Sequence, residues 1–147
     1  MSPDILFSTA NTVAVLGWLV LGFAVLCRND WLRDHLAGRW LPLVFAGLYS
    51  VLIFFFFGRG PGGFGSLGDV QALFTSPWMA LAGWVHYLAF DLFIGALIAR
   101  RVMAAGLPRV VLLVLLPTTF LFGPLGLLLS EFTLLALRPR ALAAPEE

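Results

Sequence analysis

The chain has 147 residues, of which 61% are hydrophobic and only 12% are charged, whereas soluble domains carry about 25% charged residues. Nine basic and eight acidic residues are too few to cover the surface of a soluble domain of this size. We therefore expect lipid to surround the remaining apolar surface. All nine basic residues are arginines, and the net charge of +1 excludes a basic surface for nucleic acid. A single cysteine excludes a disulfide scaffold and a cysteine-based metal cluster.

Four apolar stretches approach or exceed the roughly 20 residues that a helix needs to cross a bilayer. Unbroken apolar runs within them exclude the alternation of barrel strands, and lipid requires that backbone groups be satisfied within each segment. We therefore predict an all-α polytopic membrane protein, a single domain over residues 1–147 that forms a bundle of four transmembrane helices. The predicted spans are Ile5–Cys27, Leu41–Phe57, Pro77–Ala99 and Val110–Leu137.

Arginine placement predicts the orientation of the spans. Six arginines lie in the two linkers that follow the first and third spans, and three lie elsewhere. Because cytoplasmic loops carry an excess of basic residues, we expect these two linkers in the cytoplasm and both termini outside. Arginine without lysine, in a sequence rich in alanine and leucine, is typical of a bacterium with GC-rich DNA, so we expect the bacterial inner membrane. The six linker arginines are Arg28, Arg33, Arg39, Arg100, Arg101 and Arg109.

The remaining loop, Gly58–Ser76, is rich in glycine. The run from Gly58 to Gly68 holds six of the fifteen glycines in the chain, which is too flexible a composition for a helix. We interpret this loop as a mobile outer hairpin, with a lid over a lipid-facing opening as the alternative.

Three ionisable residues lie within the predicted spans, where such residues are costly and usually functional. They are His86, Asp91 and Glu131. Tyr87 precedes Asp91 by one helical turn, so its phenol can approach the carboxyl group, and Trp84 lies on the same face. His86 lies about 140° away from Asp91 around the helix axis. We expect Glu131, near the end of the last span, to have a structural or interfacial role.

The last predicted span contains helix-breaking residues at the depth of His86. Pro124 has no backbone donor and therefore frees the carbonyl of Phe120. We expect His86 to meet the kink at Phe122, Gly123 and Pro124, which would form a polar pocket in the middle of the bilayer. The equally weighted alternative is that these polar groups only hold the helices together.

Two segments carry a family resemblance. The block LAGWVHYLAFDLFIG at residues 81–95 and the block FLFGPLGLLL at residues 120–129 resemble the family of small four-helix membrane proteins related to the plant abscisic-acid-deficient-four protein, a neoxanthin-synthase-like group. The resemblance implies conversion of violaxanthin to neoxanthin, which opens an epoxide and forms an allene without net redox change. Such a reaction needs a proton donor to the epoxide oxygen and a base that removes a carbon-bound proton.

The polar residues within the spans and the resemblance together give the candidate site residues, and His86 and Asp91 are the two that match the family block, with Tyr87 as their helper. Three residues are candidates for catalysis: His86, Asp91 and Tyr87. The candidate ligand-binding residues are Trp84, Phe90, Phe122, Gly123, Pro124 and Glu131.

We expect no metal and no cofactor, because the chemistry is metal-free acid–base isomerisation. The expected partners are membrane lipid and a carotenoid or isoprenoid ligand, and a homo-oligomer or a membrane protein partner stays open. A non-enzymatic scaffold or partner-binding subunit is the alternative function, and a small transporter is the third.

Overall fold

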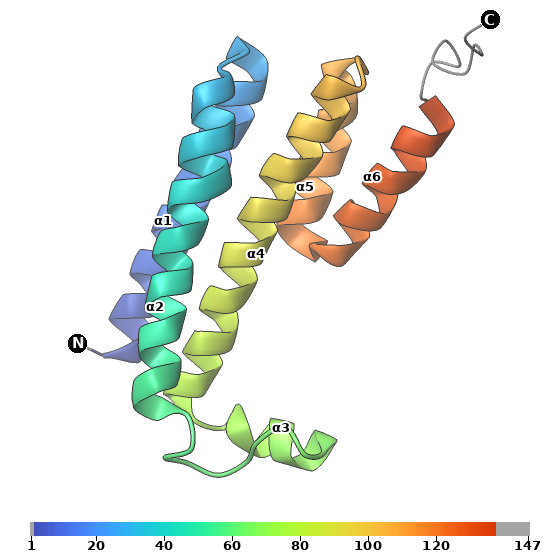
Figure 1. Cartoon of the computed structure of the whole chain (residues 1–147). Coiled ribbons are helices and arrows are strands. Elements are labelled where there is room, and N and C mark those ends of the chain that lie inside the picture. The colour runs from blue at the N-terminus through green and yellow to red at the C-terminus, as the bar shows by residue number, and fades with distance from the viewer. Residues whose placement is uncertain (1, 138–147) are drawn as a thin grey trace, which may run out of the picture.

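The structure is a computed structural model that describes residues 2–137, and every regular element in this range is helical (Figure 1). The all-helical prediction is therefore confirmed. In chain order the elements are α1 (Pro3–Cys27), the π-helix η1 (Leu32–Trp40), α2 (Leu41–Phe56), α3 (Leu67–Leu73), α4 (Pro77–Ala104), the 3₁₀ turn η2 (Arg109–Val111), α5 (Leu112–Phe122) and α6 (Pro124–Leu137).

Within residues 2–137, three helices are long and apolar enough to cross a membrane. They are α1 with 25 residues, the continuous helix of η1 and α2 with 25, and α4 with 28. At about 1.5 Å per residue each exceeds the roughly 30 Å of the hydrocarbon core. The chain is an integral membrane protein.

The π-helix η1 occupies a segment that the sequence predicts as a loop. The helical segment begins at Asp30, and the side chain of Asn29 caps it by accepting a hydrogen bond from Leu32 N at 3.0 Å. Arg33 lies buried within the first turn and pairs with both Asp30 and Asp34 at 2.7 Å. Because the buried charge of this segment, that of Arg33, is paired with neighbouring residues, the polar segment can be helical and run directly into α2.

The last predicted span differs most from the prediction. Residues 110–137 do not form one crossing: α5 ends at Phe122, Gly123 adopts φ 15° and ψ −80°, and Pro124 begins α6. With 11 and 14 residues, the two helices rise only about 16 and 21 Å, so neither reaches across the hydrocarbon core. Within residues 2–137, three of the four predicted spans are thus continuous helices of sufficient length, and the fourth is divided into two shorter apolar helices.

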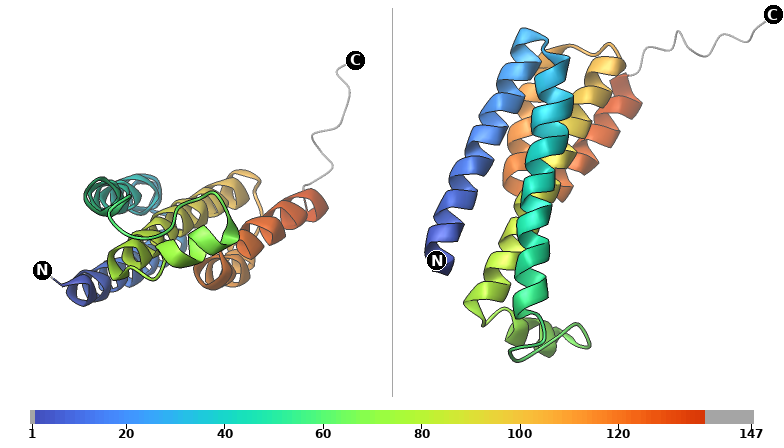
Figure 2. Two further views of the ribbon diagram at one scale, coloured as in Figure 1. Left: turned by 90° about the horizontal axis from the view of Figure 1, so that it is seen from below. Right: turned by 60° about the vertical axis from the view of Figure 1, so that its left-hand side comes forward.

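Helices α5 and α6 form a re-entrant hairpin, which we call the α5–α6 hairpin (Figures 1 and 2). It starts at the end of the bundle where α4 finishes, turns at Gly123 beside the middle of α4, and returns to the same end. The two helices pack closely because Gly126 lies against the backbone of Thr119, where a Cβ atom would find no room. The start of α1 and the finish of α6 lie toward opposite ends of the fold (Figures 1 and 2). The expectation that both termini lie outside concerns residue 1 and residues 138–147, which lie beyond the described range, and it stays a prediction.

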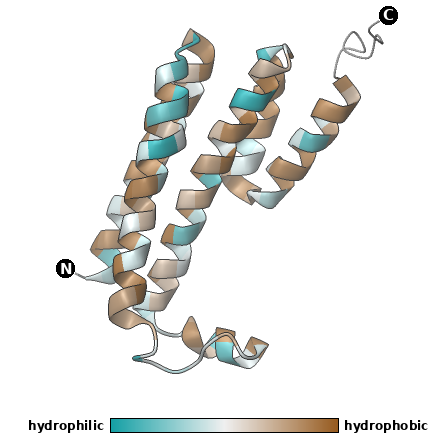
Figure 3. Ribbon diagram, in the orientation of Figure 1, coloured by the Kyte–Doolittle hydropathy of each residue, from teal (hydrophilic) through white to brown (hydrophobic). Residues whose placement is uncertain are grey.

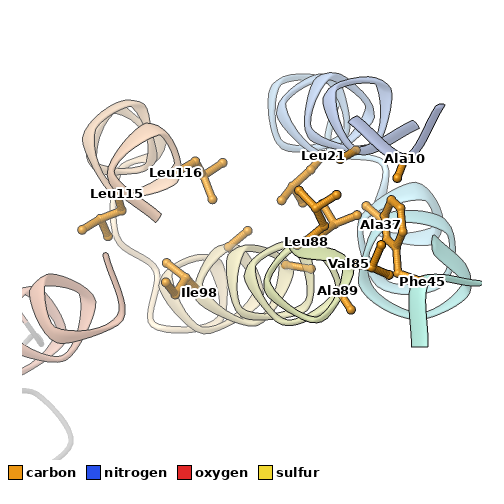
Figure 4. Packing of buried hydrophobic residues seen from close by; sticks show 14 of the residues in the cluster. Ala10, Leu21, Ala37, Phe45, Val85, Leu88, Ala89, Ile98, Leu115 and Leu116 are labelled. Carbon is orange, nitrogen blue, oxygen red and sulfur yellow. The ribbon is translucent and has the colours of Figure 1, made fainter. Parts of the chain in front are cut away.

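Helix α4 is the centre of the fold, with α1 and α2 on one side and the α5–α6 hairpin on the other. Figure 4 shows Leu21 of α1, Phe45 of α2 and Val85 of α4 gathered on the first side, and Leu115 of α5 on the second. Glycine allows α1 to approach α4, since a Cβ atom at Gly95 would lie 2.5 Å from the Trp18 ring.

Polar residues gather at the two ends of the bundle, and the helices between them are mostly hydrophobic (Figure 3). We call the end that carries η1, the finish of α4 and the linker arginines the arginine end.

The loop between α2 and α4 is more ordered than its composition predicts. It contains the short helix α3, whose N-terminus is capped by Ser66, which accepts a hydrogen bond from Asp69 N at 3.1 Å. Phe74 follows α3 and lies against α4, because its ring occupies the space beside Gly83. The glycine run is not helical from Gly58 to Ser66, as its composition predicts, but its last two residues, Leu67 and Gly68, belong to α3, and there the prediction is wrong.

Candidate functional site

Tyr87 connects α4 to the turn of the α5–α6 hairpin. Its hydroxyl donates toward two backbone oxygens at the end of α5, those of Phe120 at 3.2 Å and Leu121 at 3.3 Å. Pro124 has no N–H to offer the carbonyl of Phe120, so the phenol replaces the missing helical donor. The freed carbonyl is the one that the sequence predicts, but its partner is Tyr87.

Asp91 lies one helical turn after Tyr87 and is buried, with 5% of its surface exposed. Its carboxylate touches the turn at Gly123, and a Cβ atom there would collide with Asp91 Oδ1. Among the described residues, Asp91 Oδ2 is the buried side-chain polar atom that has no hydrogen-bond partner. An unpartnered polar atom in an apolar interior is costly, so a bound molecule that supplies a partner would gain free energy there.

An aromatic groove opens beside Tyr87 between α1, α4 and α5, with a volume of about 340 Å³. Its polar groups are few: Trp84 Nε1 donates to Asn11 Oδ1 at 2.7 Å, and Tyr87 contributes its phenol. The rings of Trp84 and Tyr87 stack with centroids 5.3 Å apart, and Phe7 lies 5.8 Å from Trp84 on the outer side. The complete lining is Asn11, Ala14, Val15, Trp84, Tyr87, Leu88, Phe120 and Leu121.

His86 lies away from this groove, and the expected meeting between His86 and the hairpin turn is wrong. Its exposed imidazole faces α2 instead. The centroid of the imidazole ring lies 5.4 Å from that of the Tyr49 ring and 4.7 Å from that of the Phe90 ring. The cause is the helical angle between His86 and Asp91, which directs the two side chains to different neighbours.

His86 borders a second recess of about 210 Å³ that α3 and Phe74 cover from the loop side. This position fits the alternative interpretation of the loop as a lid. The recess is lined by Tyr49, Ile53, Phe64, Leu73, Phe74, Met79, Ala82, Gly83 and His86.

The other candidate ligand-binding residues separate into three places. Phe122 and Pro124 are exposed at the hairpin turn, next to Gly123. Phe90 lies on the α2 side of α4, beside His86. Glu131 lies on α6 and forms a two-pronged ion pair with Arg101 of α4, so it holds the hairpin against α4 at the arginine end.

Tyr87 thus lies between the aromatic groove, which Trp84 also lines, and the contact of Asp91 with the turn at Gly123, whereas His86 lies on another side of α4. Sequence reasoning missed Asn11, although an amide within a predicted span is a signal that could have found it. Within residues 2–137, no three histidine, cysteine, aspartate or glutamate side chains come together as a metal site would require. The arrangement offers a phenol, a carboxyl group and an aromatic wall, which suit an elongated apolar ligand with few polar groups.

Comparison with known protein families identifies a match. The sequence profile described as ABA DEFICIENT 4-like matches residues 5–129, a range that runs from the first turn of α1 through the turn at Gly123 into the first half of α6. Neither the curated proteins nor the solved structures contain a match to this chain.

Proposed function

Because the chain belongs to the ABA DEFICIENT 4-like family, we propose that it binds a carotenoid or a related isoprenoid lipid in the aromatic groove and isomerises it by acid–base chemistry. The observation that carries the proposal is the unpartnered, buried Asp91 Oδ2 one turn behind a phenol that lines the groove. A membrane-embedded carboxyl group is a functional-site candidate by default.

The groove suits a long conjugated hydrocarbon. Trp84, Tyr87 and Phe120 supply ring faces, and the lining is largely apolar. A polyene entering from the lipid phase would exchange one apolar environment for another, so affinity would come from packing on the rings and from the few polar groups.

The proposed chemistry keeps all atoms of the substrate. One proton is delivered to an oxygen of the ligand, such as that of an epoxide, and one proton is removed from carbon, so the product is an isomer. Tyr87 and Asp91 are the proposed pair, because they lie one turn apart on one face. His86, on the α2 side, does not belong to this pair, and we assign it to the recess under α3.

We also propose the location of the protein in a bacterial inner membrane with the arginine end in the cytoplasm. Arg28, Arg33, Arg39, Arg100, Arg101 and Arg109 lie in or beside the connections at that end, while Arg59 lies in the opposite loop. This distribution follows the positive-inside rule.

The experiment is expression in cells that accumulate violaxanthin, followed by chromatography of the pigments. The wild type is expected to produce a new isomer, and Asp91→Asn and Tyr87→Phe are expected to lower its yield by at least tenfold at equal protein level. His86→Gln serves as the matched control on the same helix and should keep the yield. Unchanged pigments with the wild type in violaxanthin, zeaxanthin and β-carotene backgrounds would remove the proposal.

Transport is a second candidate function, which the α5–α6 hairpin favours. Interrupted helices that end within the membrane are common in transporters, where the turn lies beside a bound substrate. In the described fold, the turn at Gly123 lies against Asp91. Proton flux into liposomes that contain the wild type, absent with Asp91→Asn, would favour transport over isomerisation, and tight vesicles would exclude it.

A further inference from the structure

Another groove, distinct from both the aromatic groove and the recess beside His86, lies between the η1–α2 helix and α4. It is on a different side of α4 from the aromatic groove. It has a volume of about 440 Å³ and is apolar except at one end, where Arg39 lines it. The lining residues are Gly38, Arg39, Pro42, Leu43, Ala46, Ala89, Phe90 and Phe93.

Small residues leave this space between the helices. Ala46 of α2 and Ala89 of α4 both line the groove, and their short side chains leave open space that longer side chains would fill. At the arginine end the helices come close, since a Cβ atom at Gly38 would lie 3.0 Å from Ala96 Cβ. The groove therefore runs from the polar end of the bundle into its apolar middle, over about 10 Å of helix between Arg39 and Ala46.

Arg39 brings a positive charge to the mouth of the groove. Its guanidinium lies 5.5 Å from the ring centroid of Trp40, a pairing that is typical of the membrane–water interface. No ion pair within residues 2–137 includes Arg39, whereas Arg33 is paired with Asp30 and Asp34.

The surroundings of Arg39 carry excess positive charge as well. Arg28, Arg100 and Arg109 also lie at the arginine end without an ion pair in the described part of the chain. The arginine end therefore attracts an anion, and the apolar groove beside it fits a hydrocarbon chain.

We propose that this groove binds one anionic membrane phospholipid, with its phosphate on Arg39 and one acyl chain along Leu43, Ala46 and Phe90. Basic residues at the cytoplasmic ends of transmembrane helices bind anionic headgroups in this way. The inference stands apart from the proposed isomerase, because the two grooves lie on different sides of α4 and share no lining residue.

The experiment is native mass spectrometry of the full chain released from nanodiscs that contain equal amounts of phosphatidylglycerol and phosphatidylcholine. We expect the wild type to retain one phosphatidylglycerol molecule in preference to phosphatidylcholine. Arg39→Gln should weaken this retention about fivefold, the change expected for one interfacial charge. Ala46→Phe should weaken it to a similar extent with Arg39 intact, because the added ring fills the path of the acyl chain.

Matched controls separate this site from general effects of charge and bulk. Arg59→Gln removes an arginine from the opposite loop, and Val44→Phe adds a ring to the exposed face of α2 outside the groove; both should retain the lipid as the wild type does. Equal retention of the two lipids by the wild type would overturn the proposal, as would undiminished retention by Arg39→Gln. Displacement of the lipid by millimolar inorganic phosphate would equally overturn it, since that result assigns the site to a soluble anion.

Discussion

The Tyr87 hydroxyl on α4 donates to the carbonyl oxygen of Phe120 on α5 at 3.2 Å. This bond links the two segments that carry the family resemblance, and it satisfies a carbonyl that the break before Pro124 leaves without a helical donor. The candidate site and the stability of the α5–α6 hairpin therefore depend on the same phenol.

Loss of the Tyr87 hydroxyl should destabilise the hairpin. Tyr87→Phe removes the donor to Phe120 and Leu121 but keeps the stacking on Trp84. We expect a loss of about 1 kcal/mol in the free energy of unfolding, the usual net value of one hydrogen bond, measured by unfolding in mixed detergent micelles. Tyr49→Phe, which removes a phenol hydroxyl on α2, is the control and should change the free energy of unfolding by less than half as much.

A side chain at Gly123 should clash with Asp91. Gly123→Ala places a Cβ atom against the carboxylate, and overpacking of this kind costs about 1–3 kcal/mol. In an Asp91→Ala background the clash is absent, so the same substitution should cost much less. The difference, obtained as a double-mutant cycle, measures the contact directly, and additive effects of the two substitutions would contradict it.

The ion pair between Arg101 and Glu131 should contribute modestly to the free energy of unfolding. The two side chains are 38% and 41% exposed, and pairs of this exposure stabilise by about 0.2–1 kcal/mol. We expect Glu131→Gln to lower the free energy of unfolding within that range. The charge-reversed pair, Arg101→Glu with Glu131→Arg, should recover most of the loss, whereas a purely local effect of position 131 would leave the loss unrecovered.

The hairpin predicts an accessibility pattern that a fourth crossing does not. Cys27 is the single cysteine of the chain, so a membrane-impermeant maleimide reports its side of the membrane. With Cys27→Ser as background, Ala136→Cys should react from the same side as Cys27 does in the wild type, and Gly60→Cys should react from the other side. Reaction of positions 136 and 60 from one side would show that residues 110–137 cross the membrane.

Much of the site could be predicted from local spacing. The approach of Tyr87 to the face of Asp91 and the freed carbonyl of Phe120 follow from helical geometry and from the chemistry of proline. The partner of that carbonyl could not be predicted in this way. The angle between His86 and Asp91 is a property of one helix, but the neighbour that each side chain meets depends on how α2 and α5 pack around α4.

The hairpin could not be predicted from hydropathy. An apolar stretch of 28 residues has the length of one crossing, and two short helices folded back on each other have the same composition. The difference lies in the backbone of Gly123 and in the close contact of Gly126 with Thr119. The polar segment from Leu32 to Trp40 is the opposite case, because its composition indicates a loop while the cap by Asn29 and the local pairing of Arg33 permit a helix.

The hairpin also determines the order in which the protein can assemble. Its turn exposes backbone carbonyls that would have no donor in lipid, and each such group costs several kcal/mol. The donor comes from Tyr87 in the middle of α4, so the turn becomes tolerable at that depth only once α4 is already in the bilayer. Membrane insertion of this chain is thus sequential. The α5–α6 hairpin enters the bilayer last and packs against α4, which is already inserted.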